Sequence, residues 1–157
     1  MQYIDFERTE RVEQVRAEIA RLVERAFLTP QQGEAVDPAK IAAFFAPPLG
    51  RELMASTSLR REFKFSILVP AADYYPQAGA EEQVLLQGVV DCCFETLEGI
   101  TVVDFKTDRV DRRSVAARAE EYRPQLAAYS RALEEITGKP VIRRCLWFFA
   151  LDQAVDV

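Results

Sequence analysis

Histidine is absent from this chain of 157 residues. It is the side chain that most often transfers protons near neutral pH, and it is also a frequent metal ligand. Its absence excludes both roles for that residue type here. Any catalysis by these residues must use carboxylates, lysine, tyrosine or water activated by a metal ion.

Cysteine is scarce, with three residues in the chain. Cys92 and Cys93 are adjacent, so on a strand their side chains would point to opposite faces and could not hold one metal without distortion. Cys145 stands apart, and no Cys-x-x-Cys occurs. The spacing argues against zinc and iron–sulfur sites, and we expect three buried thiols.

Long apolar runs and phosphate-binding loops are absent too. No hydrophobic stretch approaches the ~20 residues that span a bilayer. Residues 1–7 lack the basic and then apolar layout of a secretory signal. We therefore expect a cytoplasmic protein without membrane contact. The pattern G-x-x-x-x-G-K-[ST] does not occur either, so no ATP-dependent motor is expected within these residues.

Length and charge set broad limits. A chain of 157 residues can bury one core, so we predict a single domain over residues 1–157. The net charge of −5 argues against tight binding of nucleic acid by the whole surface. One stretch is nevertheless basic, with Lys106, Arg109, Arg112, Arg113, Arg118 and Arg123. Such residues usually face solvent, and contact with a phosphate backbone is the alternative.

Hydrophobic spacing predicts an α/β protein with a mixed sheet. Helices are expected over residues 9–28, 38–45, 49–55, 114–122 and 124–137. Strands are expected over residues 59–69, 83–96, 100–106 and 141–150. The first three strands would form an antiparallel meander. Thr9 is the expected N-cap of the first helix, which Thr29-Pro30 would end. The main elements then follow the order α-β-β-β-α-β, with small helical insertions near the N-terminus.

Two aspartates and a lysine fall on neighbouring strands of that meander: Asp91, Asp104 and Lys106. Asp104 and Lys106 are two apart, so they share one face of their strand. A salt bridge at a sheet edge would explain a lone aspartate, but a second aspartate after one turn weakens that explanation. Two carboxylates beside an ammonium can hold a divalent cation and stabilise a developing negative charge. That is the chemistry of phosphodiester cleavage.

Three further residues are candidates near this trio. Gln125 and Tyr129 are four apart, so they share one face of the helix that follows. Alone, such a pair would be explained by core packing and local capping. Directly after Asp-x-Lys it becomes a candidate for orienting the lysine or a nucleotide. Glu62 is most simply a solvated strand charge, with a role near the metal as the alternative.

These motifs resemble the RecB-type nuclease domain of the PD-(D/E)xK superfamily. The resemblance rests on GVVD at 88–91, VDFKTDRV at 103–110 and YRPQLAAY at 122–129. Within the superfamily, nearly the whole chain is similar to the C-terminal nuclease domain of AddA-type helicase–nucleases. The Gln-x-x-x-Tyr pair makes the match much more specific than Asp-x-Lys alone.

The resemblance implies a role for each motif. Asp91 and Asp104 would bind Mg²⁺ or Mn²⁺, with the Phe105 carbonyl as a further ligand. Lys106 would polarise the scissile phosphate or position the attacking water, and the Gln-x-x-x-Tyr pair would lie beside the site. The implied fold is a restriction-endonuclease-like core, with helices flanking a mixed sheet. The implied activity is that of a metal-dependent DNA exonuclease in double-strand break repair and recombination.

The chain departs from the family at one position. The family usually adds a metal-binding histidine on its first helix, and this chain has none. Residues 1–6 resemble the sequence just after that histidine, so we expect a fragment of a larger helicase–nuclease, with weak activity or none. For the full-length protein the resemblance implies a DNA substrate, a helicase domain in the same chain and an AddB-like partner.

Two other functions remain open from the sequence. A catalytically silent domain that docks DNA or a partner would explain the missing histidine, although the retained buried charges oppose it. An unrelated small-molecule-binding α/β domain lacks a positive signal, such as a glycine-rich loop.

Overall fold

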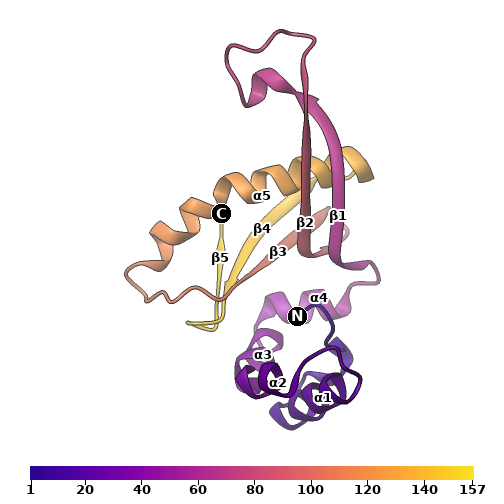
Figure 1. Ribbon diagram of the computed structural model, residues 1–157, viewed down its shortest axis with the longest axis vertical. Coiled ribbons are helices and arrows are strands. Elements are labelled where there is room, and N and C mark those ends of the chain that lie inside the picture. The colour runs from indigo at the N-terminus through magenta and orange to yellow at the C-terminus, as the bar shows by residue number, and fades with distance from the viewer.

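Five strands form one mixed sheet in the computed structural model, which describes residues 1–157 (Figure 1). The strands are β1 (Leu59–Pro70), β2 (Gln83–Glu95), β3 (Ile100–Lys106), β4 (Val141–Phe148) and β5 (Gln153–Asp156), adjacent in that order. The antiparallel meander β1–β2–β3 is confirmed. β4 then lies parallel to β3, because the long helix α5 (Val115–Thr137) carries the chain back across the sheet.

Helices cover the sheet on both faces. The N-terminal helices are α1 (Val12–Glu24), α2 (Pro30–Ala35), α3 (Pro38–Phe45) and α4 (Pro48–Ala55), with short 3₁₀ turns at Phe6–Arg8 and Ala71–Asp73. The N-terminal helical lobe packs on one face, where Phe44 meets Trp147. α5 packs on the other face through Tyr129 and Leu133. The α/β mixed-sheet fold is thus the one expected.

The three thiols are buried and free, as expected. Cys92 lies in the core beneath the N-terminal helices, and its neighbour Cys93 lies in the core beneath α5. Burial raises the pKa of the Cys93 thiol to about 11 and that of Cys145 to about 12. All three are therefore protonated and unreactive at neutral pH.

The first helix is shorter than the prediction of residues 9–28, and the expected N-cap was wrong. Thr9 is fully buried, and its hydroxyl donates to the Phe6 carbonyl in the preceding 3₁₀ turn. The helix begins at Val12, where the Arg11 amide donates to Gln14 Oε1 at 2.9 Å. It ends at Glu24, because the chain then turns through a positive φ of 58° at Ala26.

Helix α2 is absent from the elements expected from the sequence. Thr29-Pro30 was expected to stop a helix, yet the same residues start one. The Thr29 hydroxyl accepts from the Gln32 amide at 3.1 Å, and Gln32 Oε1 accepts from the Thr29 amide at 2.8 Å. This is a reciprocal capping arrangement, and Pro30 suits the first helical position.

α5 is one continuous helix, so the prediction of two helices over 114–122 and 124–137 was wrong. Pro124 lies inside it, although proline removes a backbone hydrogen bond. Buried contacts on both sides of the proline, at Ala119 and Leu126, carry the helix past it. Gly138 ends the helix with a φ of 70°, as its position predicted.

The C-terminal strand was missed. β4 ends at Phe148, two residues earlier than expected, and the chain turns through a φ of 50° at Asp152 into β5. β5 pairs with the second half of β4 only. The expectation that β4 is buried on both faces holds from Cys145 to Phe148.

The distal part of the β1–β2 hairpin extends beyond the body of the protein as an arm (Figure 1). Its outward face carries the cross-strand pair Leu68 and Leu85, both more than half exposed. None of the helices combines the length and apolar character that a bilayer crossing requires.

Candidate active site

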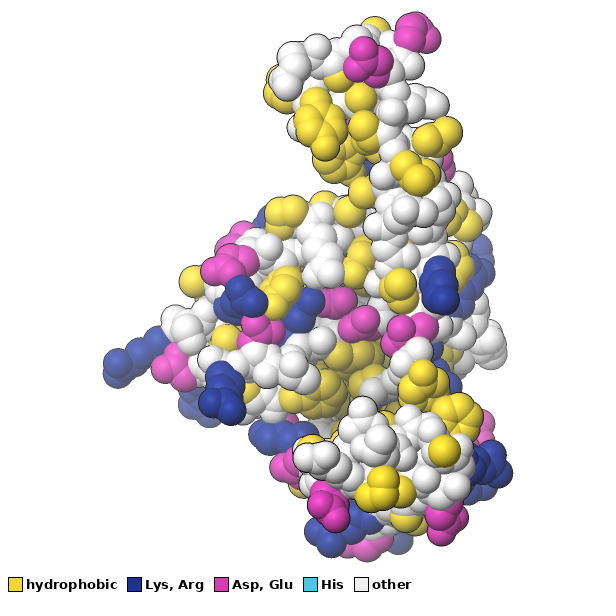
Figure 2. All heavy atoms as spheres, viewed as in Figure 1, with side chains coloured by type: hydrophobic (Ala, Val, Ile, Leu, Met, Phe, Trp, Pro, Cys, Tyr) yellow, Lys and Arg dark blue, Asp and Glu magenta, His cyan; other side chains and the backbone are white.

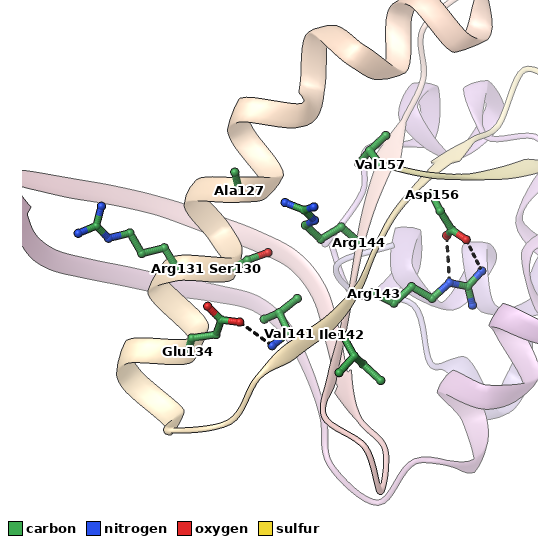
Figure 3. A pocket seen from close by; sticks show the side chains of 10 residues that line it. All are labelled: Ala127, Ser130, Arg131, Glu134, Val141, Ile142, Arg143, Arg144, Asp156 and Val157. Atoms are coloured by element: carbon green, nitrogen blue, oxygen red, sulfur yellow. Dashed lines mark hydrogen bonds and ion pairs between the residues drawn. The ribbon is translucent and has the colours of Figure 1, made fainter. Parts of the chain in front are cut away.

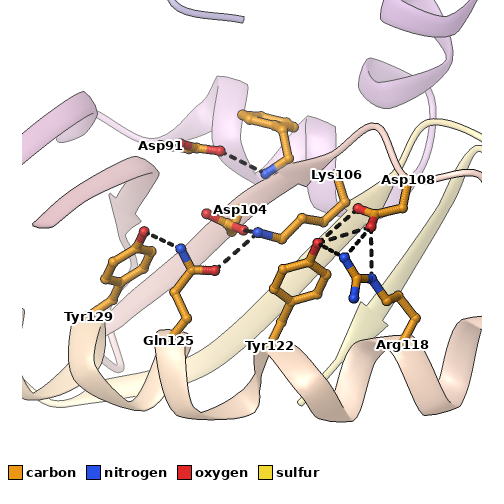
Figure 4. A network of polar contacts seen from close by, with 9 residues as sticks. Asp91, Asp104, Lys106, Asp108, Arg118, Tyr122, Gln125 and Tyr129 are labelled. Carbon is orange, nitrogen blue, oxygen red and sulfur yellow. Dashed lines mark hydrogen bonds and ion pairs between the residues drawn. The ribbon is translucent and has the colours of Figure 1, made fainter.

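The meander brings Asp91 and Asp104 to the same end of the β2–β3 ladder. The last ladder pair is Cys92 with Val103, and the two aspartates are the next residue on each strand. Asp104 and Lys106 lie on the face of β3 that is covered by α5, where Lys106 reaches Gln125 (Figure 4). The three residues therefore meet on the side of the sheet facing α5.

Strand β1 is irregular directly opposite Asp91. Flanking pairs keep a single register, Arg61 with Cys92 and Phe63 with Val90, but Glu62 is missing from the ladder and has a φ of 51°. A non-glycine residue in this region is strained by about 1–3 kcal/mol. Strain of this kind often accompanies functional sites.

The side-chain alternation of β2 inverts at the same place. Val90 belongs to the core under α5, whereas Cys92 belongs to the core under the N-terminal helices. Residues two apart on a regular strand would share a face. The Asp91 carboxylate is therefore free of ordinary strand geometry, and its Oδ2 accepts a hydrogen bond from the Phe105 amide at 3.0 Å.

Asp104 is 2% exposed and has one oxygen without a hydrogen-bond donor. Its Oδ2 forms an ion pair with the Lys106 ammonium, but the contact lacks hydrogen-bond geometry. Burial raises the pKa of Asp104, the lysine opposes that rise, and the nearby charge of Asp91 adds to it. A buried carboxylate beside a second carboxylate is a position that a cation would stabilise.

Lys106 is held from the side of α5 by the predicted helix pair. Its Nζ donates to Gln125 Oε1 at 3.1 Å, and Gln125 Nε2 donates to the Tyr129 hydroxyl oxygen at 2.7 Å (Figure 4). The second bond orients the amide so that its oxygen faces the lysine. Burial and the charge of Asp104 both raise the pKa of Tyr129, so its phenol stays protonated.

Sequence reasoning missed a second group that adjoins Lys106. The ring of Tyr122 lies under the ammonium, with 3.7 Å from Nζ to the ring centroid. The Tyr122 hydroxyl contacts Asp108 and Arg118 (Figure 4). The signal was present, because Tyr122 lies three residues before Gln125 and thus on the same helix face.

The basic stretch divides into two kinds of residue. Arg118 is paired with Asp108, and Arg123 with Glu120. The remaining arginines lie on the exposed loop before α5 and form no ion pair: Arg109, Arg112 and Arg113. Figure 2 shows acidic side chains in a band across the middle of one face, with basic side chains to its sides.

The donor set fits a magnesium-like ion only in part through side chains. No group of three or more acidic, cysteine or histidine side chains converges as a metal site, so Glu62 does not complete a third carboxylate ligand. Asp91 and Asp104 offer hard oxygen donors. Mg²⁺ is commonly bound by one or two carboxylates, with water and substrate phosphate completing its shell. The uncompensated Asp104 oxygen therefore suits such an ion.

A cavity of about 530 Å³ lies apart from these residues, between the second half of α5 and the strands β4 and β5 (Figure 3). Its charged groups mostly have partners. Arg143 donates to Asp156 at 2.9 Å, and the Glu134 carboxylate accepts from the Val141 amide at 2.8 Å. We assign no ligand to it.

Comparison with known proteins identifies the family. Residues 2–155 match the PD-(D/E)XK nuclease superfamily. The chain belongs to this superfamily. Its curated relatives include an ATP-dependent helicase/nuclease of the AddA type from Acetivibrio thermocellus, 42% identical over 95% of this chain. The corresponding proteins of Desulforudis audaxviator and Bacillus cytotoxicus are 41% and 35% identical over 94% and 100% of the chain.

The chain spans 12–13% of the length of these relatives. Nucleases of this superfamily generally use divalent metal ions, which agrees with the chemistry of the donor set. Membership also removes the alternative of an unrelated small-molecule-binding domain. The individual roles of Asp91, Asp104, Phe105 and Lys106 stay predictions, as do those of the helix pair and Glu62.

Proposed function

We propose that this chain is the nuclease domain of a helicase–nuclease and hydrolyses phosphodiester bonds of DNA with Mg²⁺ or Mn²⁺. One observation carries the proposal: the buried Asp104 carboxylate, with an oxygen lacking a hydrogen-bond donor, meets Asp91 and Lys106 at one point. A purely structural aspartate would have its oxygens satisfied by donors. This one has an oxygen available to a cation.

Each side chain then has a distinct task. Asp91 and Asp104 hold the metal with the Phe105 carbonyl, and the bound ion supplies Lewis-acid stabilisation of the phosphate and activation of water. Lys106 donates to a non-bridging phosphate oxygen or positions the attacking water. Gln125 fixes the lysine, and the Tyr129 hydroxyl proton has no protein acceptor, which leaves it available to a substrate oxygen.

The arginine loop supports contact with a DNA backbone. Asp108 and Asp111 on the same loop are occupied internally: Asp108 pairs with Arg118, and Asp111 Oδ1 accepts from the Arg113 and Ser114 amides at 3.0 and 2.9 Å. The loop is therefore held in shape while its arginine side chains face solvent. Phosphate contacts from such residues would set the position of the strand without reading its sequence.

The wider context is also a proposal. The relatives are named as ATP-dependent helicase/nucleases, so we place this domain in a chain with a helicase and beside an AddB-like partner, where it would act as an exonuclease in double-strand break repair and recombination. A catalytically silent docking domain is the second candidate. It is favoured by the finding that only two carboxylates converge and no histidine joins them.

The test is cleavage of end-labelled single-stranded DNA with Mn²⁺ or Mg²⁺. Asp104→Asn keeps the size of the side chain but removes its charge, so we expect it to abolish cleavage. It should also abolish the rise in melting temperature that Mn²⁺ gives the parent. Asp73→Asn makes the same change at an exposed ion pair with Arg131 and should retain both. A folded parent that neither cleaves DNA nor binds Mn²⁺ would overturn the nuclease proposal in favour of the docking domain.

A further inference from the structure

The contact between Lys106 and Tyr122 is not explained by core packing. The ammonium sits 3.7 Å from the ring centroid, well inside the ~6 Å range of cation–π attraction. The lysine side chain is only 11% exposed, so its charge is largely removed from water. Such contacts strengthen when the cation is desolvated. The ring thus forms one wall of the lysine site.

Tyr122 is itself anchored at its far end. Its hydroxyl lies 3.0 Å from both oxygens of Asp108 and donates to that carboxylate, while Arg118 Nη2 donates to the hydroxyl oxygen at 2.7 Å. Arg118 Nε also donates to Asp108 at 2.7 Å. Burial and the bond to Asp108 raise the pKa of Tyr122, so the phenol keeps the proton that it donates.

The ring attracts the ammonium in a way that its other neighbours do not. Asp104 opposes the positive charge with a full negative charge, and Gln125 Oε1 takes one N–H bond. A ring face attracts the cation without neutralising it and without a carboxylate that would repel a phosphate. A free lysine side chain has many rotamers, so confinement from several directions removes entropy before substrate binds.

We propose that Tyr122 is a positioning residue, whose ring, clamped by Asp108 and Arg118, holds the Lys106 ammonium between Asp104 and Gln125. The placement is an inference about the resting protein. Its consequence for catalysis rests on the proposed function, in which Lys106 contacts the phosphate or the attacking water.

The placement can be measured without any activity. The chain has four lysines: Lys40, Lys64, Lys106 and Lys139. With ¹³C-labelled lysine, a proton–carbon correlation spectrum should show one Hε pair shifted upfield by the ring current of Tyr122. Lys106→Met should remove that signal, Tyr122→Leu should return it to the position of the others, and Tyr122→Phe should keep it. Four Hε signals at the same shift in the parent would overturn the placement, even if no variant folds.

The catalytic consequence is measured by separating kcat from KM on single-stranded DNA with Mn²⁺. Tyr122→Leu should lower kcat on the order of tenfold with KM within about twofold, because the ring contributes to alignment rather than to DNA binding. Tyr122→Phe keeps the ring and should restore most of kcat, while Asp108→Asn, which loosens the clamp, should fall between them. Equal losses in Tyr122→Phe and Tyr122→Leu would overturn the role of the ring, as would a change confined to KM.

The two readouts separate this inference from the proposed function. If the parent lacks cleavage but the upfield lysine signal is present and depends on Tyr122, the placement stands and the nuclease proposal fails. If Asp104→Asn abolishes cleavage while Tyr122→Leu leaves kcat unchanged, the nuclease proposal stands and the positioning role fails.

Discussion

Glu18 and Asp104 are the two acidic residues buried in this protein, each 2% exposed, yet their surroundings differ. Glu18 accepts hydrogen bonds from the Asp5 amide at 2.9 Å and from Arg21 Nε at 2.7 Å. Its charge is fully paired, and it ties the N-terminal segment to α1. Asp104 has an oxygen with no donor. For a single residue, satisfaction of the carboxylate separates a structural acid from a candidate ligand.

Glu18 gives a prediction about stability. The Arg21 bond lowers the pKa of Glu18 despite its burial. A folded-state pKa below the ordinary value of 4.5 means that the stabilisation is complete above that pH and is lost as the pH falls through the folded pKa. Glu18→Gln should lower the free energy of unfolding by about 1.5–3 kcal/mol at neutral pH, and the difference from the parent should shrink in acid.

Urea unfolding of both proteins across this pH range measures the effect. Glu13→Gln is the matched control, because Glu13 is an exposed acid on the same helix. It should change stability by less than about 0.5 kcal/mol. A constant difference between Glu18→Gln and the parent from neutral pH into acid would contradict the charged-pair explanation.

Helix α5 connects the two halves of the site and contains the least expected backbone feature of the protein. Pro124 is exposed and lies directly before Gln125. Its ring removes the amide that would donate to the Glu120 carbonyl. The helix nevertheless aligns Tyr122, Gln125 and Tyr129 on one face, so packing of its buried face outweighs the local defect. A whole element is therefore set by what it covers as much as by its own residues.

The proline gives a prediction for the element. Pro124→Ala restores the missing donor and removes the ring, so it should raise the free energy of unfolding by about 1–3 kcal/mol. Pro38→Ala is the control, because Pro38 occupies the first turn of α3, where its amide is not needed. It should be neutral or slightly destabilising. Thermal and urea unfolding compare the pair, and equal effects of the two substitutions would refute this account.

Charge is distributed unevenly over the whole molecule. The net charge of −5 coexists with a loop that carries Arg109, Arg112 and Arg113 without ion pairs, next to the candidate site. Contacts to single-stranded DNA release about 0.7 counterions per neutralised phosphate. A strand bound along this loop would therefore have an affinity that falls with salt, in spite of the acidic surface elsewhere.

This distribution gives a prediction for the molecule as a whole. Replacing the three loop arginines by glutamine should raise the Kd for single-stranded DNA. It should also reduce the slope of log Kd against log salt by up to about 2. The control replaces Arg11, Arg16 and Arg25, which are also exposed and unpaired. Both variants have the same net charge, so an equal loss in the control would mean that overall charge, and not the loop, governs binding.

Much of this protein follows from local patterns. The alternation of β1, the meander and the start of α3 at Asp37-Pro38 depend on residues close in sequence, and each was predicted. The spacing of Asp104 with Lys106 and of Gln125 with Tyr129 also fixes which residues share a face, because strand and helix periods are constant. Family-level motifs and their order could therefore be recognised without coordinates.

Other features depend on contacts between distant segments or on local strain, so the order of residues did not reveal them. The positive φ of Glu62 and the inverted alternation at Asp91 arise where two strands and β3 meet, and no local pattern encodes them. The continuity of α5 through Pro124 and the addition of β5 come from burial against the sheet. The contact of Tyr122 with Lys106 depends on the closure of α5 over β3. Local periodicity specifies which chemical groups are present and on which faces they lie, whereas the packing of α5 and the strained β1–β2 position make them meet.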